Sequence, residues 1–492
     1  MAEFDLAILG GGINGTAIAR DAAGRGLRVL LVEQGDLAAG TSSASSKIVH
    51  GGLRYLRYGA FRLVREALGE REILLRMAPH IVRPLRFVLP PADGFLEALV
   101  LRTGLFLYDR LAARDILPAT RTIDLRQDIA GRPLKDAFRY GFEYSDCSVD
   151  DARFVVLNAL DARERGADVR TRTRCIRAER GSDWRLLLDN HGQQQTASAR
   201  VLVNATGPWI ASVADSVLGV PLAASARLVK GSHIVVRRNA GHGRAYTLQA
   251  QDGRVVFALP FSRDFTLIGT TDEEFTGNIG APAPDAVEIA YLCNAANRYF
   301  QDPISPHDVV WAFAGIRSLH DDGSKKPEDV TRDYTLTLDE GAGTTPVLTV
   351  YGGKITTARR LAEVALDRLA HVLRPGPAWT ASSHLPGGDF APGRFDAAVV
   401  QAQARWPFLD PVQAERLTHA YGTRLDRILG DATSLDALGP YFGGGLTGAE
   451  VRYLVQAEWA ETADDILWRR TKCGLRVSAS DVEALTRFMA QG

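Results

Sequence analysis

The sequence predicts an α/β fold in which a Rossmann-type nucleotide-binding domain is combined with an antiparallel-sheet domain and followed by an all-helical C-terminal domain. Three observations predict it: a glycine-rich turn between an N-terminal strand and a helix, consecutive strand-like runs over 233–272, and helical patterns from about 394 onward. At roughly 150 residues per domain, 492 residues are enough for about three domains.

The first 35 residues contain the pattern of a βαβ unit. An apolar run over 4–9 predicts a strand, 13–23 has helical character, and 28–33 is again strand-like. Two strands joined by a crossover helix lie parallel to each other in one sheet.

The turn inside this unit, Gly10-Gly-Gly-Ile-Asn-Gly15, has the G-x-G-x-x-G pattern. Its glycines allow a pyrophosphate to approach the N-terminus of the following helix. Glu33 ends the second strand, where a carboxylate can bind a ribose diol and would repel a 2′-phosphate. The pattern therefore favours NAD or FAD over NADP and does not separate the first two.

Later segments continue the alternation of helices and strands. We expect an antiparallel sheet from the runs between 233 and 272, because no helix fits between them. We further expect helices over 59–78, 95–111 and about 356–373, and strands at 201–208, 309–314, 333–338 and 347–351.

A proline- and glycine-rich stretch over 374–393 precedes the helical C-terminal region, which we expect to begin near 394. Within it, Thr447-Gly-Ala-Glu450 and Ser480-Asp-Val-Glu483 fit the capping-box pattern at a helix start.

Composition excludes several classes of protein. The 58 basic residues balance 58 acidic ones, which argues against a nucleic-acid-binding protein. Four cysteines lie far apart without a C-x-x-C pair, so we expect neither disulfides nor a metal site, and a reducing cytoplasm fits. We see no secretory signal and no apolar run of about 18 residues that would span a membrane.

A hydroxyl-rich loop follows the βαβ unit. Residues 39–47 (AGTSSASSK) contain Thr41, Ser42, Ser46 and Lys47, and such a loop can hold phosphate oxygens with its hydroxyl and N–H groups. The alternative is a flexible linker, which Gly/Ser-rich runs usually form. The loop is short and lies inside a domain, which favours the phosphate interpretation.

Several motifs beyond the glycine-rich turn occur in order along nearly the whole chain. The sequence resembles the FAD-dependent, aerobic, quinone-linked glycerol-3-phosphate dehydrogenases in these motifs: GGGINGTAIARDAAGRG, TSSASSKIVHGGLRYL, FEYSDCSVDDAR, VNATGPW, KGSHIVV, IGTTD, TRDYTL, GGKITT and DILWRRTKCGL. One departure is Gly315-Ile-Arg-Ser318, where the family often has proline in place of Ser318.

The resemblance implies noncovalent FAD, oxidation of sn-glycerol 3-phosphate to dihydroxyacetone phosphate, and delivery of electrons to membrane quinone. It implies a Rossmann-type FAD-binding domain (1–80, 145–225 and 340–375) with an antiparallel-sheet substrate domain (81–144 and 226–339) like that of the amino-acid oxidases, plus helical residues 394–492. It also implies a peripheral enzyme at the cytoplasmic face of the inner membrane, and it leaves a homodimer open.

Matching residue by residue, the resemblance assigns a set of FAD contacts. These are Gly10, Gly12, Ile13, Asn14, Gly15, Glu33, Thr41, Ser42, Ser46, Lys47, Gly51, Gly52, Leu53, Arg174, Cys175, Ala205, Thr206, Gly207, Gly353, Lys354, Ile355 and Thr356.

A substrate phosphate near −2 charge requires cationic side chains with several donors. Arg54, Arg317, Arg332 and Lys354 lie in the matched motifs, and Tyr55 and Thr270 are further substrate-binding candidates. Lys354 stands between Gly353 and a helix start that can face the flavin, where it would stabilise the negative charge of reduction.

Oxidation of the substrate also needs a base for the hydroxyl proton, and histidine suits neutral pH. His50 and His233 lie in matched motifs. We favour His233, because it starts a strand of the predicted substrate sheet; the alternative is that His50 is the base. If His233 is the base, His50 positions FAD.

Lysine is rare in this chain, at 7 lysines against 51 arginines. Lys47, Lys230 and Lys354 fall in segments that we expect to line the cofactor and substrate. Because arginine cannot replace a lysine at a site built for it, Lys354 ranks first among them.

Three alternatives remain open. The apolar stretch 95–111, in which Arg102 and Arg110 flank 105–108, could lie at a membrane interface or be a buried helix of the substrate domain. The enzyme could be an oxidase that reduces oxygen to peroxide. The chain could also be a non-catalytic nucleotide-binding regulator, against which the cluster of cationic residues argues.

Overall fold

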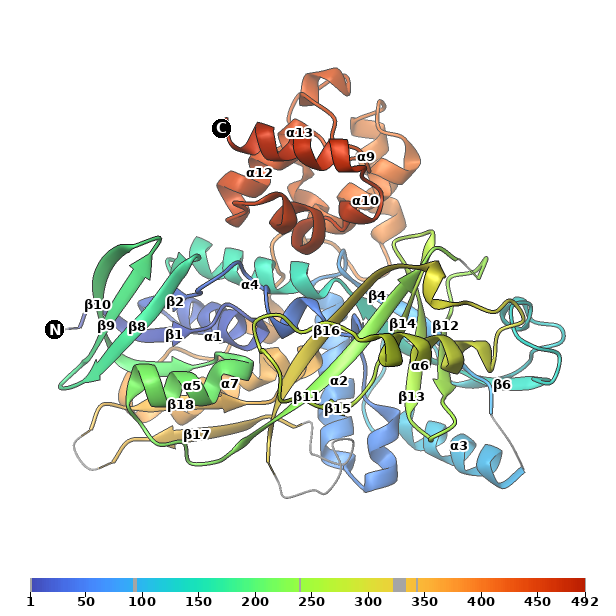
Figure 1. Cartoon of the computed structure of the whole chain (residues 1–492), viewed down its shortest axis with the longest axis horizontal. Coiled ribbons are helices and arrows are strands. Elements are labelled where there is room, and N and C mark those ends of the chain that lie inside the picture. Colours follow the sequence, from blue (N-terminus) through green and yellow to red (C-terminus); the bar gives the residue numbers. More distant parts are fainter. Residues whose placement is uncertain (1, 92–94, 239, 322–332, 342–343, 492) are drawn as a thin grey trace.

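The computed structural model describes residues 2–91, 95–238, 240–321, 333–341 and 344–491, with the backbone alone at 54, 57, 58 and 95–98. The chain forms two sheet-based parts side by side and a helical C-terminal part above them (Figure 1). This arrangement agrees with the predicted fold class.

The first sheet contains the N-terminal βαβ unit. Its strands are β1 (Phe4–Leu9), β2 (Val29–Val32), β7 (Asp168–Arg170), β8 (Thr173–Arg180), β9 (Trp184–Asn190), β10 (Gln193–Asn204), β17 (Thr335–Asp339) and β18 (Val347–Tyr351). β1 pairs in parallel with β2 and β10, and β10 pairs in parallel with β18, which confirms the predicted parallel unit.

Helices α1 (Ile13–Gly24), α4 (Asp151–Glu164) and α7 (Ala358–Arg368) cover one face of this sheet, where their apolar residues join those of β1 and β2 in one core. The antiparallel strands β8 and β9 cover the other face around Trp184, which is fully buried. Because both faces are covered, the central strands read as continuous apolar runs rather than alternating ones.

The second sheet is largely antiparallel, as predicted. Its strands are β3 (Ile48–Val49), β4 (Val82–Leu89), β5 (Arg121–Asp124), β6 (Tyr140–Val149), β11 (Ala226–Val236), β12 (Ala245–Gln249), β13 (Val255–Phe261), β14 (Phe265–Gly269), β15 (Glu273–Glu274) and β16 (Val309–His320). β12 and β4 pair in parallel, since they come from separate segments of the chain. Helix α6 (Ala286–Asn297) packs on one face, and α2 (Phe61–Met77) and α3 (Phe95–Tyr108) pack on the other.

Strand pairing departs from the predicted domain boundaries at three points. β17 pairs with β18 in the first sheet, although the boundary between 339 and 340 separates them. β6 lies wholly in the second sheet, although the predicted boundary between 144 and 145 divides it. β3 pairs with β6 in the same sheet, although its residues fall in the segment 1–80 that is predicted for the FAD-binding domain. Hydrogen bonding between strands, rather than position along the chain, decides these memberships.

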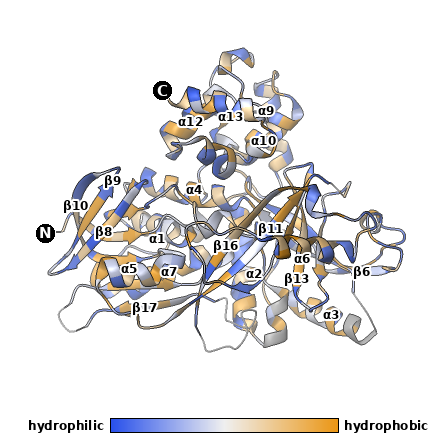
Figure 2. Ribbon diagram, viewed as in Figure 1, coloured by the Kyte–Doolittle hydropathy of each residue, from blue (hydrophilic) through white to orange (hydrophobic). Residues whose placement is uncertain are grey.

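The C-terminal part begins with α9 (Phe395–Arg405), close to the predicted start. Its further helices are α10 (Pro411–Tyr421), α11 (Asp426–Leu429), α12 (Gly448–Glu458) and α13 (Ala479–Met489), while the short α5 (Ile210–Val213) and α8 (Ala370–Leu373) lie earlier in the chain. Figure 2 shows polar and apolar residues interspersed on these C-terminal helices, as expected for helices that bury one face.

Both predicted capping boxes are wrong. The side chain of Thr447 makes no cap bond at the start of α12, and the carboxylate of Glu450 bonds to Arg416 and Tyr421 rather than to the helix start. The box of α13 forms two residues earlier than predicted, between Ser478 and Asp481.

Helix α3 has a divided surface. Leu105 and Tyr108 are buried, while Val100 is 60% and Phe106 54% exposed. Among the described residues, no helix is long and apolar enough to cross a membrane.

Candidate functional site

The glycine-rich turn packs closely against the end of β10. Gly10 has a φ of +112°, and a Cβ on it would lie 2.5 Å from the carbonyl oxygen of Ala205. A Cβ on Gly15 would lie 1.9 Å from the carbonyl oxygen of Gly10. Only glycine allows this approach, which exposes the N-terminus of α1 where Rossmann folds hold a pyrophosphate.

Glu33 follows β2 beside this turn. Its carboxylate accepts hydrogen bonds from the backbone N–H of Gly11 at 2.6 Å and of Gly35 at 2.7 Å. Burial raises the pKa of Glu33, and the two backbone hydrogen bonds oppose that rise. The carboxylate lies at the end of β2, which is the position from which a Rossmann fold binds a ribose.

The hydroxyl-rich loop is bonded to its surroundings and is not a flexible linker. Ser42 Oγ accepts a hydrogen bond from the backbone N–H of Ile13 at 2.9 Å. Thr41 Oγ1 donates to the carbonyl of Ile316, in β16, at 2.5 Å. The loop therefore joins the glycine-rich turn to the second sheet.

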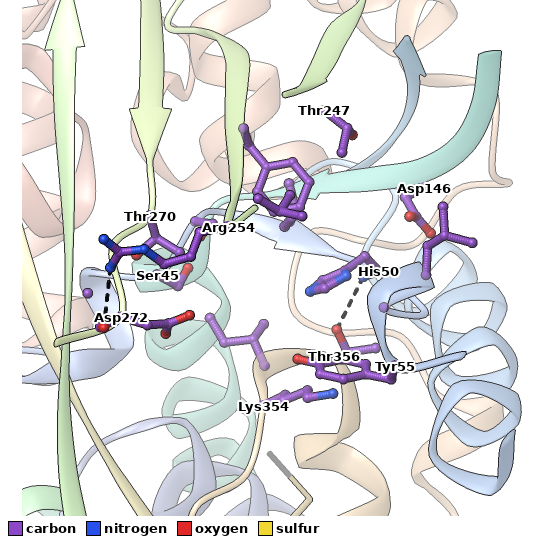
Figure 3. Close-up of a pocket in the computed structure, with 18 of the residues that line it drawn as sticks. Ser45, His50, Tyr55, Asp146, Thr247, Arg254, Thr270, Asp272, Lys354 and Thr356 are labelled. Carbon is purple, nitrogen blue, oxygen red and sulfur yellow. Dashed lines mark hydrogen bonds between the residues drawn. The ribbon is translucent and has the colours of Figure 1, made fainter. Parts of the chain in front are cut away.

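A cavity of about 520 Å³ opens between the two sheets beside this loop. Figure 3 shows His50, Tyr55 and Lys354 projecting into one space, with Thr270 and Asp272 across from them. The structure brings many of the predicted site residues to its walls, namely Ile13, Thr41, Ser42, Ser46, His50, Gly52, Leu53, Tyr55, Thr270, Arg317, Gly353, Lys354, Ile355 and Thr356.

Lys354 is a half-buried residue whose buried ammonium nitrogen has unused donors. Its Nζ lies 3.8 Å from the centre of the Tyr55 ring and has no hydrogen-bond partner among the described residues. Gly352 and Gly353, with φ of +64° and +95°, turn the chain before it. Asn14 Nδ2 donates to the carbonyl of Gly352 at 3.0 Å, so α1 and this turn are held together.

Arg317 stands on the opposite wall, on β16. Its Nη1 donates to Asp272 Oδ1 at 2.7 Å, and its Nη2 lies 3.4 Å from Thr270 Oγ1. A Cβ on Gly231 would lie 2.8 Å from this guanidinium, so glycine leaves the room that Arg317 occupies. Asp272 orients the guanidinium and leaves part of it facing the cavity.

His50 lines the cavity, and its backbone N–H donates to Thr356 Oγ1 at 3.3 Å. Burial, with the charges of Lys354 and Arg71, lowers the pKa of His50 to about 3. The imidazole is therefore neutral around pH 7, and it accepts a proton readily only when a nearby negative charge raises this pKa.

His233 lies behind the cavity wall rather than on it. It falls in the middle of β11 and not at its start, so its ring is buried, stacks on Phe313 at 5.0 Å, and reaches Ser46 Oγ with Nε2 at 2.9 Å. Burial lowers its pKa well below the ordinary value. The prediction that His233 starts a strand is therefore wrong, and this predicted position was the reason for favouring His233 as the base.

Of the three lysines in segments expected to line the cofactor and substrate, Lys354 lines the cavity, and Lys47 and Lys230 do not. Lys47 Nζ bonds to both carboxylate oxygens of Asp151, at 2.7 and 2.8 Å, and to the carbonyl of Ser43. Lys230 Nζ lies 2.8 Å from Glu288. Both ammonium groups have nearby carboxylates that neutralise them, so they hold structure and do not face the cavity.

Other predicted FAD contacts lie away from the cavity walls. The N–H of Gly51 donates to Tyr108 Oη at 2.7 Å, and Cys175 packs in the core behind the first sheet. Arg174 is exposed on β8, and the stretch Ala205, Thr206 and Gly207 follows β10 beside the glycine-rich turn. The side chain of Arg54 and all of Arg332 lie outside the described residues.

Several cavity residues are not among those predicted from the sequence. Asp146 is a buried carboxylate bonded to Arg71 and Tyr108, each within 2.9 Å, and it lies inside the quoted FEYSDCSVDDAR motif. Arg254, Thr247 and others come from the strands of the second sheet, where nothing in the local pattern distinguishes cavity-facing positions. The cavity residues that were not predicted include Tyr144, Asp146, Thr247, Gln249, Arg254, Phe257 and Asp272.

The residues present fit a flavin dinucleotide. The close-packed glycine turn and Glu33 suit the pyrophosphate and ribose, and the cavity begins at Ile13 directly beside them. Two buried polar atoms at that junction, Asn14 Oδ1 and Lys354 Nζ, have no partner in the described part of the chain. Unpartnered buried polar atoms of this kind are expected where a bound group supplies the missing hydrogen bonds.

Comparison with known proteins agrees with this geometry. Residues 5–359 match the family model of FAD dependent oxidoreductases, and residues 378–491 match the C-terminal domain of alpha-glycerophosphate oxidase. A glycerol-3-phosphate dehydrogenase of Bacillus halodurans, solved with FAD, has a TM-score of 0.78 at 26% identity and covers 100% of this chain and 91% of its own.

Curated relatives extend over almost the whole chain. A glycerol-3-phosphate dehydrogenase of Pseudomonas aeruginosa is 50% identical over 99% of this chain and 95% of its own length. A D-erythritol 1-phosphate dehydrogenase of Brucella abortus is 47% identical over 98% and 97%. The aerobic glycerol-3-phosphate dehydrogenase of Escherichia coli is 45% identical over 100% and 98%. The chain therefore belongs to the FAD-dependent glycerol-3-phosphate dehydrogenase family, as the resemblance predicts, and is a flavoenzyme of that family.

Proposed function

We propose that this enzyme oxidises sn-glycerol 3-phosphate to dihydroxyacetone phosphate and passes the electrons to a membrane quinone. The observation that carries the proposal is the cavity beside the dinucleotide turn, in which a neutral imidazole and two cationic side chains face the same space. The names of the relatives support the substrate class.

Arg317 and Lys354 suit a substrate phosphate of charge near −2. Asp272 occupies one donor of Arg317 and orients the rest of its guanidinium toward the cavity. Lys354 Nζ has no described partner, and an ammonium buried without one is costly unless an anion joins it. A phosphate, or the charge that develops during oxidation, supplies that anion.

His50 is the base in this proposal. When bound, FAD supplies the acceptor for the hydride that leaves C2 of the substrate. The imidazole of His50 lines the cavity and accepts the proton of the 2-hydroxyl, once the negative charge of the bound substrate raises the pKa that burial and nearby cations depress. His233 acts indirectly, because its bond to Ser46 Oγ orients a hydroxyl on the cavity wall.

We propose that helix α3 contacts the membrane, and that it does so at the cytoplasmic face of the membrane. Leu99, Val100, Phe106 and Leu107 expose apolar surface on it, and the guanidinium of Arg110 lies 3.7 Å from the Phe106 ring. An apolar face with flanking cations suits an anionic membrane surface. Leu101 of the same helix lines the cavity, so a quinone at this surface lies close to the redox site.

The test is anaerobic reduction of the flavin, followed by its absorbance. Glycerol 3-phosphate should bleach the flavin, glycerol should not, and added quinone should restore the colour faster than oxygen does. Rapid peroxide formation without quinone would establish an oxidase instead, and no bleaching by glycerol 3-phosphate would contradict the proposed substrate.

D-erythritol 1-phosphate is a second candidate substrate, because a relative named for it is 47% identical over 98% of this chain. It carries the same phosphate and a chain longer by one carbon. Comparing kcat/KM for the two phosphates decides between them.

Membrane contact is tested by co-sedimentation with anionic phospholipid vesicles. Phe106→Asp should lower the bound fraction, whereas Val287→Asp, at a position 78% exposed on α6, should leave it unchanged. Equal binding of both variants would contradict the role of α3.

A further inference from the structure

The motif DILWRRTKCGL, in the C-terminal part, has no role in the proposed reaction. Its first six residues form a π-helical segment, Asp465–Arg470, which we name the clamp segment. It contacts both sheets. Trp468 stacks on Trp311 of β16 with ring centres 4.7 Å apart, while Arg469 and Arg470 reach a loop of the first sheet.

That loop, residues 33–38, joins β2 to the hydroxyl-rich loop and is named the ribose loop. Its Asp36 is completely buried, and both carboxylate oxygens are bonded by the clamp segment. Arg470 donates to Oδ1 at 2.7 Å and to Oδ2 at 2.8 Å, and Arg469 Nε donates to Oδ2 at 2.5 Å. Among the described residues, no other side chain donates to this carboxylate.

A second contact holds the same loop through Arg172. The backbone N–H of Arg172 donates to the carbonyl of Gly35 at 2.9 Å. Its guanidinium donates to the two carboxylate oxygens of Asp465 at 2.9 and 2.7 Å. Burial would raise the pKa of Asp465, but hydrogen bonds from the backbone and from Arg172 outweigh it and lower that pKa to about 2. The pair is therefore charged throughout the physiological pH range.

The ribose loop in turn encloses the glycine-rich turn. Glu33 accepts the N–H of Gly11 at 2.6 Å, and the N–H of Ala38 donates to the carbonyl of Gly11 at 3.1 Å. A Cβ on Gly11 would lie within 2.9 Å of both Glu33 and Leu37. With packing this close, a shift of the loop moves Glu33 and the turn together.

We propose that the C-terminal part retains FAD: the clamp segment, through Asp36 and Arg172, holds the ribose loop in the geometry that binds the adenosine end of the cofactor. Arg469 and Arg470 act as positioning residues, because they touch the loop and not the cofactor site. The inference rests on the FAD site and is independent of which substrate or acceptor the enzyme uses.

Electrostatics support this role. Burial is the main cause of the raised pKa of Glu33, the nearby charge of Asp36 raises it further, and Arg172 lowers it. By pairing with Asp36, the two arginines of the clamp segment offset the charge that opposes ionisation of Glu33. An ionised carboxylate is the stronger acceptor for ribose hydroxyls.

The experiment measures FAD release from the purified holoenzyme after dilution, followed by the recovery of flavin fluorescence. Arg469→Ala and Asp36→Asn are compared with Arg424→Ala. Arg424 donates to Glu164 of α4 at 2.8 Å, so it joins the C-terminal part to the same domain but away from the ribose loop. We expect the first two variants to release FAD about tenfold faster or more. Arg469→Ala removes charge-assisted hydrogen bonds to Asp36 and to Asp465, and Asp36→Asn weakens those to the clamp segment. Arg424→Ala should match the wild type.

Thermal unfolding of the FAD-free proteins, followed by circular dichroism, separates retention from loss of fold. Arg469→Ala, whose side chain is 19% exposed, leaves the pair of Arg470 with Asp36 intact and should unfold near the temperature of the control. If Asp36→Asn does not fold, Arg469→Ala alone decides. Release of FAD from Arg469→Ala at the rate of Arg424→Ala would overturn the proposal, whatever the enzyme's substrate proves to be.

Discussion

The junction with the C-terminal part holds buried cations and the substrate cavity holds half-buried ones, and the two groups differ in how many of their donors are used. At the junction, Arg153 donates to Glu458 and to the carbonyl of Ala420, and Arg470 donates to Asp36 and to the carbonyl of Glu458. In the cavity, Lys354 Nζ lies over the face of the Tyr55 ring and has no hydrogen-bond partner in the described part of the chain.

This difference distinguishes charges that hold the fold from charges that a bound ligand would neutralise. Removing an ion from water costs several kcal/mol of solvation free energy, and only good hydrogen bonds to an opposite charge offset that cost. A cation whose donors are all used is therefore structural. One with unused donors in a cavity is stabilised when an anion binds.

The largest expected effect comes from a substitution that breaks the junction with the C-terminal part. Arg153→Ala should lower the free energy of unfolding by about 3–5 kcal/mol, because it removes the hydrogen-bonded partner of the buried Glu458 carboxylate and leaves Arg470 Nε 3.9 Å away. Urea unfolding followed by tryptophan fluorescence measures this, with Arg126→Ala as the control, since Arg126 pairs with Asp124 at the exposed surface. Equal urea midpoints for the two variants would show that the buried pair does not support the junction.

The next largest effect is expected on turnover, from replacement of Lys354 in the cavity. Lys354→Ala should lower kcat by about 10²–10³-fold, the usual loss on removing one group that stabilises developing charge. Lys354→Arg should also impair turnover, since a planar guanidinium does not reproduce a compact ammonium. The control is Lys135→Ala, an exposed lysine bonded to the carbonyl of Asn297. Turnover of Lys354→Arg at the wild-type rate would argue that a point charge is not needed there.

Replacing Arg317 should have a smaller effect, mainly on the binding of substrate. Arg317→Ala should raise KM for glycerol 3-phosphate and the inhibition constant for inorganic phosphate, each by about ten- to hundredfold, as expected for a hydrogen bond between charged groups. Arg185→Ala, an exposed arginine of β9, is the control. Unchanged inhibition by phosphate would remove Arg317 from the phosphate site.

The smallest effect is a dependence of stability on pH. Burial lowers the pKa of His50 to about 3 and of His419 to about 4, and lowers that of His80 well below its ordinary value. Their folded pKa values lie below the unfolded value of about 6.5, so the unfolded state binds more protons between these limits. The stabilisation is therefore present above about pH 6.5 and is lost as the pH falls below it, by up to about 1.4 kcal/mol per pH unit for each histidine.

The test of this pH dependence compares wild-type protein with His80→Asn between pH 7.5 and 5. The thermal midpoint of the variant should fall less steeply with decreasing pH. Parallel curves would mean that His80 is not held neutral in the folded state.

Much of the site follows from local sequence, because local sequence decides local backbone. Gly10 to Gly15, Glu33 and the turn before Lys354 are recognisable from glycines and strand ends, and the structure has them where expected. Along the chain, the residues next to Lys47 and Lys230 resemble those next to Lys354, so the sequence did not separate the three lysines by their surroundings. They differ because Asp151 and Glu288, distant in sequence, lie beside them in the fold.

The sequence by itself determined the fold class, the βαβ unit, the dinucleotide turn and the family, since periodicity, glycine spacing and motif order are local or linear properties. Only the tertiary structure decided that His50 and not His233 lines the cavity, that β17 belongs to the first sheet, and that Asp36 pairs with Arg469 and Arg470. Strand pairing and charge pairing join residues far apart in the chain, so their outcome depends on the packed arrangement of the whole molecule.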